Sequence, residues 1–84
     1  MNNVVMRKIE VTGSYQPLAD VELVVSVAVS AQPGNSGPVY FKGDDGLDVP
    51  WLPGEWHEFH RVDLAKLEVK GAVGDVVTVI GGTW

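Results

Sequence analysis

Short strand-like runs separated by sharp turn signals dominate this sequence, above all its second half. The turn signal Pro53-Gly54-Glu55 leads into one such run, and Gly71 to Asp75 separates two further runs, the last being Val76 to Ile80. Short β-runs broken by Gly, Pro and Asp turns are typical of small antiparallel sandwiches and barrels, not of α/β enzymes. The sequence therefore predicts an all-β fold.

The clearest single strand is Val21 to Ala31. Its odd positions are all Val, Leu or Ala, and its even positions include Glu22, Ser26 and Ser30. This period of two is the signature of a half-buried strand, and the β-branched side chains disfavour a helix. We predict one strand over the whole segment.

The other expected strands are shorter and are bounded by turn residues. They are Val4–Thr12, Val39–Lys42, Leu47–Leu52, Trp56–Val62, Leu67–Lys70 and Val76–Ile80. Loops are expected at Gly13–Ala19, Gln32–Pro38 and Gly43–Gly46, and Asp63–Lys66 is expected to form a single helical turn or a bend. The fold class is thus a small antiparallel β-sandwich or barrel, jelly-roll-like, with six to eight short strands. The predicted core set is Val21, Leu23, Val25, Val27, Val29, Phe41, Phe59, Leu67, Val69, Val77 and Val79.

The chain length of 84 residues predicts one domain over residues 1–84, in which residues 1–5 could form an extended N-terminal arm. A domain of this size buries only about 60–65% of the surface that its unfolded chain exposes. The chain has no cysteine, so disulfides cannot add stability. Oligomerisation or docking on a partner is the device that remains.

The net charge and the apolar content of the chain disfavour two classes of partner. The 11 acidic and 6 basic side chains give a net charge of −5, and the basic residues are scattered along the chain. A protein that binds phosphate backbones needs a basic patch, so we expect no nucleic-acid partner. No segment has the length of apolar residues that a membrane span needs, so we expect no membrane partner either. Because the chain has no cysteine, the sequence does not indicate whether the protein works in a reducing or an oxidising compartment.

The two histidines and a group of aspartates are the candidate metal ligands. His57 and His60 are three residues apart, so on a strand they point to opposite faces, which disfavours a shared zinc ion. Asp44, Asp45 and Asp48 lie around Gly46, and their spacing matches no calcium loop, so an acidic, solvated turn is the favoured interpretation and a weak divalent-cation site is the alternative. We therefore predict no metal site.

No catalytic group stands out. The serines lie in loops, on a strand face and in a turn, and none occupies a strand-to-helix elbow. We predict no catalytic residue and no cofactor. A cupin-type enzyme is an open alternative, but it needs a histidine cluster on one face.

Three tryptophans form the largest apolar side chains. Trp51 and Trp56 could cover the ends of a small core, contact a protein partner or form a platform on which a sugar stacks. Trp84 at the end of the sequence makes most sense packed into a neighbouring molecule. These alternatives stay open at the level of sequence.

Three segments of the second half carry a resemblance to a known class. They are LPGE at residues 52–55, VDL at residues 62–64, and the pattern L-x-V-x-G-x-x-G-D-x-V-x-V at residues 67–79. Together they make residues 38–84 similar to small β-sandwich structural proteins of tailed bacteriophages, most of all to those that decorate or cement the capsid.

This resemblance implies a non-enzymatic virion structural protein on the capsid surface, assembled in the host cytoplasm. Its expected partners are the major capsid protein and further copies of itself, with a trimer favoured. Binding only to the assembled shell would stabilise that shell by mass action. A tail or neck component and a carbohydrate-binding module with Trp51 and Trp56 are the alternatives. The resemblance assigns no contact residue by residue. The candidate partner contacts lie in the N-terminal segment, at two loop tips and among the tryptophans, and they are Val4, Val5, Asn35, Asp44, Asp45, Trp51, Trp56 and Trp84.

Overall fold

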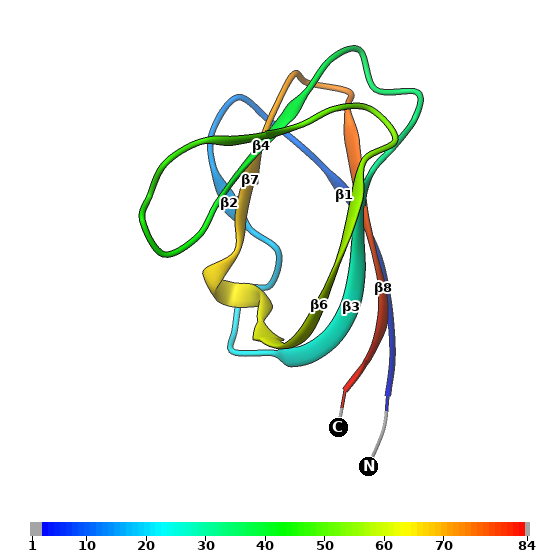
Figure 1. Ribbon diagram of the computed structural model, residues 1–84, viewed down its shortest axis with the longest axis vertical. Helices are drawn as coiled ribbons and strands as arrows, with labels where there is room; N and C mark the ends of the chain where they lie inside the picture. The colour runs from blue at the N-terminus through cyan, green and yellow to red at the C-terminus, as the bar shows by residue number, and fades with distance from the viewer. Residues whose placement is uncertain (1–2, 84) are drawn as a thin grey trace.

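The computed structural model describes residues 3–83, which form eight β-strands and one turn of 3-10 helix (Figure 1). The strands are β1 (Val4–Glu10), β2 (Gln16–Pro17), β3 (Val24–Ala31), β4 (Val39–Lys42), β5 (Val49–Trp51), β6 (Trp56–Asp63), β7 (Glu68–Lys70) and β8 (Val76–Thr83). The helical turn η1 (Leu64–Lys66) lies between β6 and β7, in the segment where a helical turn or a bend is expected. The prediction of an all-β fold is confirmed.

The strands form two antiparallel sheets of four strands each. Sheet A has the order β1-β8-β3-β6, and sheet B has the order β2-β7-β4-β5. Figure 1 shows sheet A on the right and sheet B on the left. The pairs β1·β8, β2·β7, β3·β6 and β4·β5 are those of one long hairpin rolled up on itself, and β3·β8 and β4·β7 close the roll. This is the strand order of an eight-stranded jelly roll.

The core lies between the two sheets and consists mainly of valine. Its fully buried side chains include Val25, Val29, Val77 and Val79 from sheet A, and Val39 and Val69 from sheet B. Seven predicted core residues are buried, namely Val25, Val27, Val29, Phe41, Val69, Val77 and Val79. Leu23, Phe59 and Leu67 are partly buried and pack against this cluster.

Val21 is the one predicted core residue that the structure contradicts. Its side chain is 73% exposed, because β3 begins only at Val24 and Val21 precedes the paired region. The Leu23 backbone N–H donates to Asp63 Oδ1 at 3.0 Å. A side chain, and not the backbone of a neighbouring strand, is therefore the hydrogen-bond partner of Leu23 N–H. The alternating apolar pattern of the sequence therefore starts at Val21, before the residue at which β3 begins to pair.

A β-bulge shapes the edge strand β6. Val25 pairs with Val62 but Val27 pairs with Phe59, so His60 and Arg61 both lie opposite Ser26. Arg61 has a φ of 54°, and its backbone N–H donates to Ser26 Oγ at 3.1 Å. A bulge of this kind bends the strand and increases its twist.

The strand β8 extends through Gly81 and Gly82, beyond the predicted end at Ile80. A Cβ on Gly81 would lie 2.1 Å from the Ser26 carbonyl oxygen and 2.6 Å from Val27 Cα. Only glycine lets β8 approach β3 this closely, so Gly81 continues the strand instead of ending it.

The turn at residues 32–38 is held by side chains. Asn35 Oδ1 accepts from the Val76 N–H at 2.8 Å, and Asn35 Nδ2 donates to the Val76 carbonyl at 3.0 Å. The Ser36 N–H and hydroxyl donate to the buried Asp75 carboxylate at 2.9 and 3.1 Å. Asn35 and Ser36 therefore fasten this turn to the start of β8.

The expected N-terminal arm, residues 1–5, overlaps the start of β1. Val4 and Val5 belong to β1 and pair with Gly82 and Gly81. Residues 1 and 2 lie outside the described residues. Within residues 3–83, no helix is long and apolar enough to cross a membrane.

Candidate interaction surface

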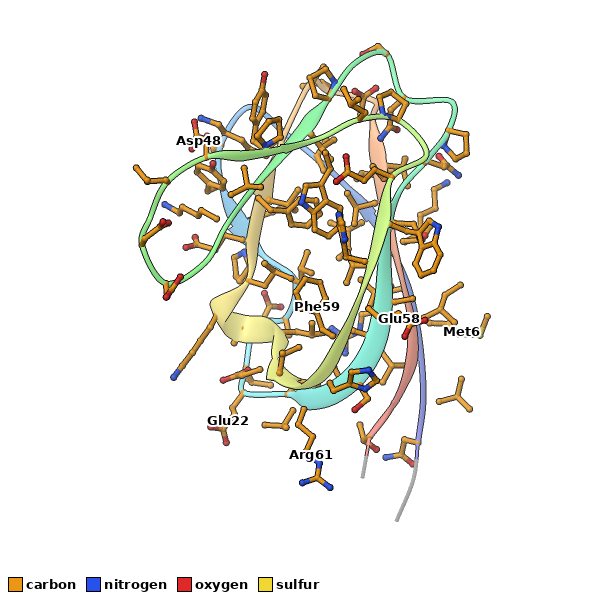
Figure 2. The ribbon with its side chains drawn as sticks, viewed as in Figure 1. Met6, Glu22, Asp48, Glu58, Phe59 and Arg61 are labelled. Atoms are coloured by element: carbon orange, nitrogen blue, oxygen red, sulfur yellow. The ribbon has the colours of Figure 1, made fainter. Side chains whose placement is uncertain are left out.

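The outer face of sheet A carries a concentration of exposed apolar side chains, which we name the apolar face. Its members are Val4, Met6, Val24, Trp56 and Ile80, with exposures of 80%, 68%, 50%, 58% and 53%. Directly paired residues of neighbouring strands point to the same face of a sheet. Met6, Ile80, Ala28 and Glu58 form one such row across the four strands, so they share the outer face. Figure 2 shows Met6 and Glu58 on the same side of the molecule.

Small side chains form the middle of this face. Ser26, Ala28 and Ser30 of β3 alternate with core valines, and they pair with Gly82, Ile80 and Thr78 of β8. A shallow hollow of about 260 Å³ lies over them, lined by residues that include Ala28, Glu58, His60 and Ile80. The outer face of sheet A thus has a shallow trough along β3, between the side chains of β8 and those of β6, and it carries Lys8, Glu58 and His60 beside its apolar side chains.

The outer face of sheet B is different, because its charged side chains are paired within the chain. Lys42 Nζ lies 3.9 Å from Glu68 Oε1, and Lys70 Nζ lies 3.6 Å from Asp48 Oδ2. Both ammonium groups lie over the Tyr15 ring, at 4.3 and 4.7 Å from its centre. Asp48 lies on the far side of the molecule from Met6 (Figure 2).

Tyr15 and Asp48 are the most perturbed pair of this cluster. The Tyr15 hydroxyl donates to Asp48 Oδ1. Burial, this hydrogen bond and the negative charges of Asp48 and Glu68 raise the pKa of Tyr15 to about 12. The same hydrogen bond, helped by the nearby Lys70, lowers the pKa of Asp48. The cluster fastens the Asp44–Asp48 loop to sheet B, and its groups satisfy one another.

The other perturbed carboxylates also have partners in the fold. The pKa of Glu55 is lowered by a hydrogen bond from His57, at 2.7 Å, and by one from the Leu52 N–H. The pKa of Asp63 is lowered by hydrogen bonds from the backbone N–H groups of Leu23 and Ala65. The Ala65 bond also caps η1. The hydrogen bonds of both carboxylates thus account for their lowered pKa values within the fold.

The two histidines lie on opposite sides of sheet A, as their spacing predicts. His57 pairs with the inward-facing Val29 and its ring contacts Trp51, with the ring centres 4.7 Å apart. His60 is the first of the two bulge residues, and its Nε2 lies 4.0 Å from Glu58 Oε2 on the outer face. Over residues 3–83, no group of three or more His, Cys, Asp or Glu side chains could hold a metal ion.

The structure separates the tryptophans. Trp51 is only 5% exposed and packs against Phe41 with ring centres 3.9 Å apart, so it is a core residue and not a contact surface. Trp56 is exposed on the apolar face, on the other side of sheet A. The two rings therefore form no common platform for a sugar. Trp84 lies outside the described residues.

The remaining sequence candidates fall in different places. Val4 lies on the apolar face, whereas Val5 is 7% exposed and belongs to the core. Both polar atoms of the Asn35 side chain are used within the fold. Asp44 and Asp45 are exposed, and Asp45 Oδ1 accepts from the Leu47 N–H at 2.9 Å, which is the hydrogen bond of an Asx-turn.

Met6 and Ile80 are not among the contact residues predicted from the sequence, although both belong to the apolar face. The available signal was the alternation in β1 of outward Val4 and Met6 with inward Val5 and Ile9. When both the odd and the even positions of an edge strand are apolar, the pattern indicates that both faces of the strand are buried, one by the core and the other by a further contact.

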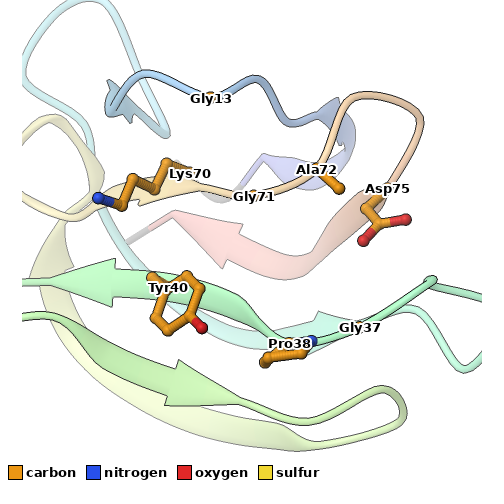
Figure 3. A pocket seen from close by; sticks show the side chains of 8 residues that line it. All are labelled: Gly13, Gly37, Pro38, Tyr40, Lys70, Gly71, Ala72 and Asp75. Carbon is orange, nitrogen blue, oxygen red and sulfur yellow. The ribbon is translucent and has the colours of Figure 1, made fainter.

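A second hollow lies at the end of the sandwich where β7 turns into β8 (Figure 3). It has a volume of about 340 Å³ and is lined by Gly13, Gly37, Pro38, Tyr40, Lys70, Gly71, Ala72 and Asp75. Its two charged groups are engaged elsewhere, Asp75 with Ser36 and Lys70 with Asp48. Of the described polar side chains that line this hollow, Tyr40 is the one left, so its walls are mainly apolar.

Comparison of this chain with protein-family models, with curated proteins and with solved structures found no match. The fold and the apolar face are therefore the observations on which a function can be argued.

Proposed function

We propose that this protein is a non-enzymatic structural protein of a bacteriophage virion that binds and stabilises the assembled capsid shell through its apolar face. The observation that carries the proposal is the difference between its two outer faces. Sheet A exposes Met6, Trp56 and Ile80, while the charges on sheet B are paired within the chain. The largest exposed apolar patch of a monomer is often functional, which supports the proposal that this face is a contact surface.

The identity of the partner comes from the resemblance of residues 38–84 to capsid-decorating proteins. The jelly roll supports it, since this fold is frequent among capsid proteins. A protein that binds the assembled shell and not its free subunits stabilises the shell by mass action, without any catalytic group. The major capsid protein is the proposed partner.

The size of the apolar face implies that one copy binds weakly. Four strands about 4.8 Å apart and seven residues long, at about 3.4 Å per residue, give roughly 450 Å². Contact would bury roughly 900 Å² in total, which is below the size of stable protein interfaces. Several linked copies would bind far more tightly, because the later contacts form at high effective concentration. We therefore propose a homo-oligomer on the shell.

Co-sedimentation tests this proposal. Empty shells would be assembled from the major capsid protein encoded nearest to the gene for this chain, and mixed with wild-type protein, Ile80→Glu or Leu47→Glu. Ile80 and Leu47 are 53% and 66% exposed, so both variants should fold. We expect wild type and Leu47→Glu to sediment with the shells and Ile80→Glu to remain in solution. Equal sedimentation of both variants, or none with wild type, would contradict the proposal.

A tail or neck station is the second proposed position on the particle, since the same face could bind there. Imaging of labelled particles would separate a ring or tail signal from a shell signal. The carbohydrate-binding alternative receives no support from the tryptophans, because Trp51 is buried and Trp56 lies on the other side of sheet A.

A further inference from the structure

One of the four sheet edges is built for pairing, and the other three are not. β2 has only two residues, β5 has three including Pro50, and β6 carries the bulge at Arg61. Short strands, proline and bulges all keep an edge from pairing with another chain. β1 has seven residues and no proline, and no other described strand lies on its free side (Figure 1).

The register of β1 shows which of its backbone groups are free for pairing. The Val11 N–H donates to the Asp75 carbonyl and the Thr83 N–H donates to the Asn3 carbonyl, both at 3.0 Å. Directly opposed residues in an antiparallel ladder alternate between hydrogen-bonded and non-hydrogen-bonded pairs. Odd-numbered residues of β1 therefore bond to β8. The N–H and C=O groups of Val4, Met6 and Lys8 point out of the sheet at its free edge, as does the Glu10 N–H, whereas the Glu10 carbonyl accepts from Gln16 Nε2 at 2.9 Å.

We propose that a second copy of this chain pairs antiparallel along β1, about a two-fold axis through the Met6 pair. The pairing joins the two A sheets into one sheet of eight strands. Met6 then opposes Met6 of the second copy, and Val4 opposes Lys8 of the second copy. About six hydrogen bonds form, because each of the three directly opposed pairs exchanges two.

The charges of β1 select this register among those that the free backbone groups allow. A two-fold axis at position 7 would place Arg7 opposite the second copy's Arg7, and an axis at position 8 would do the same with Lys8. Like charges directly opposite each other are destabilising. With the axis at Met6, Arg7 opposes Val5 and Lys8 opposes Val4. Axes at Val5 and at Ile9 also avoid like charges, but each of them overlaps fewer β1 residues.

This dimer would present its two apolar faces on the same side, because the two-fold axis is perpendicular to the joined sheet. Met6, Val4 and Ile80 of both copies would then form one surface of twice the area. The inference does not depend on the proposed function, since the pairing needs no shell. It favours two-fold association in place of the trimer that the phage resemblance implies.

Met6→Pro and Met6→Ala test the pairing of the edge. The Met6 N–H is free in the monomer, so proline removes a dimer hydrogen bond at each copy without removing one to β8. Alanine keeps the N–H and removes only the side chain. By sedimentation velocity across a concentration series, we expect Met6→Pro to weaken dimerisation at least tenfold more than Met6→Ala does. The circular dichroism melt of each monomer checks its fold.

Single-cysteine variants test the register, since the chain contains no cysteine of its own. In the proposed dimer the Met6 Cα atoms are about 5.5 Å apart, within the range for a disulfide. The two Lys8 Cα atoms would be about 14 Å apart, beyond that range. We expect Met6→Cys to form a covalent dimer under mild oxidation and Lys8→Cys to remain monomeric.

Four results would overturn the inference. Three of them are a wild-type monomer at every concentration up to about 1 mM, a dimer that Met6→Pro leaves unchanged, and preferential cross-linking through Lys8→Cys. If hydrogen exchange shows that the Val4, Met6 and Lys8 amides become protected only on shells, the edge accepts a strand of the shell protein instead, and the second-copy inference is wrong.

Discussion

The closest contact between β8 and β3 makes Gly81→Ala the most informative perturbation of the fold. An added Cβ would lie 2.1 Å from the Ser26 carbonyl oxygen, 2.6 Å from Val27 Cα and 2.7 Å from Val27 Cγ1. Two of these three atoms belong to the backbone of a central strand, so a change of rotamer cannot relieve the overlap. The two strands must separate where β3 faces the bulge of β6.

The expected cost follows from overpacking. Extra methylene groups in a packed core cost about 1–3 kcal/mol, and contact with backbone puts this substitution at the upper end or above it. A domain of this length is stable by roughly 4–13 kcal/mol in total. A loss of about 3 kcal/mol corresponds to a fall in Tm of roughly 12–24 °C for a domain of this size.

The assay is thermal unfolding followed by circular dichroism, with Gly82→Ala as the matched control on the same strand. A Cβ on Gly82 meets only the Asn3 carbonyl oxygen, at 3.1 Å, so we expect its Tm to fall by less than about 5 °C. A Gly81→Ala protein that melts within about 3 °C of wild type would show that the strands do not approach as described, and the reasoning would fail.

Three further predictions test the core, the pinned turn and the charged cluster. Val25 is 0% exposed, so Val25→Asp should bury an unpaired charge and give no soluble folded protein, as measured by soluble yield and the melting transition. Asn35→Ala should lower the free energy of unfolding by about 1–3 kcal/mol in urea titration, because the Val76 N–H loses its acceptor. Asp48→Asn should lower the pKa of Tyr15 from about 12 in a ¹³C NMR titration, but burial should keep it above 10. Because the folded pKa of Tyr15 is raised, its contribution to stability is present below about pH 10 and is lost as the pH rises through 12; a pKa unchanged by Asp48→Asn would contradict this coupling.

The sequence predicts the strands well but not their order. Period-two alternation identifies β3 because one of its faces is buried along its length, yet it also includes Val21, which pairs with nothing in the sheet. Local composition cannot show where pairing begins, because that depends on the partner strand. The pairing of β1 with β8 joins opposite ends of the chain and leaves no local signal.

Two strand predictions from the sequence were wrong, and tertiary contacts explain both: β2 was not predicted, and β8 was predicted to end too early. β2 has only two residues, at Gln16–Pro17, so no periodicity could reveal it inside a loop that contains proline. Gly81 and Gly82 resemble a strand end, but the approach of β8 to β3 requires glycine at position 81. In both cases tertiary contact decides the local structure.

The candidate surface was only partly predictable. Trp51 and Trp56 look equivalent in sequence, and only the path of the chain through β5 and β6 places one in the core and the other on the outer face. The apolar face combines residues from all four strands of sheet A. It therefore becomes visible only when the register between these strands is known.

The central claim is that this protein adheres through the outer face of sheet A. Hydroxyl-radical footprinting tests it most directly, because Met6 and Trp56 are readily oxidised and exposed on that face, while Tyr15 and Tyr40 lie on the side of sheet B. The account predicts that oxidation of Met6 and Trp56 falls when the protein is bound to shells, with Tyr40 unchanged. Protection of Tyr40 with Met6 and Trp56 still oxidised at the free rate would place the contact on sheet B and contradict the claim.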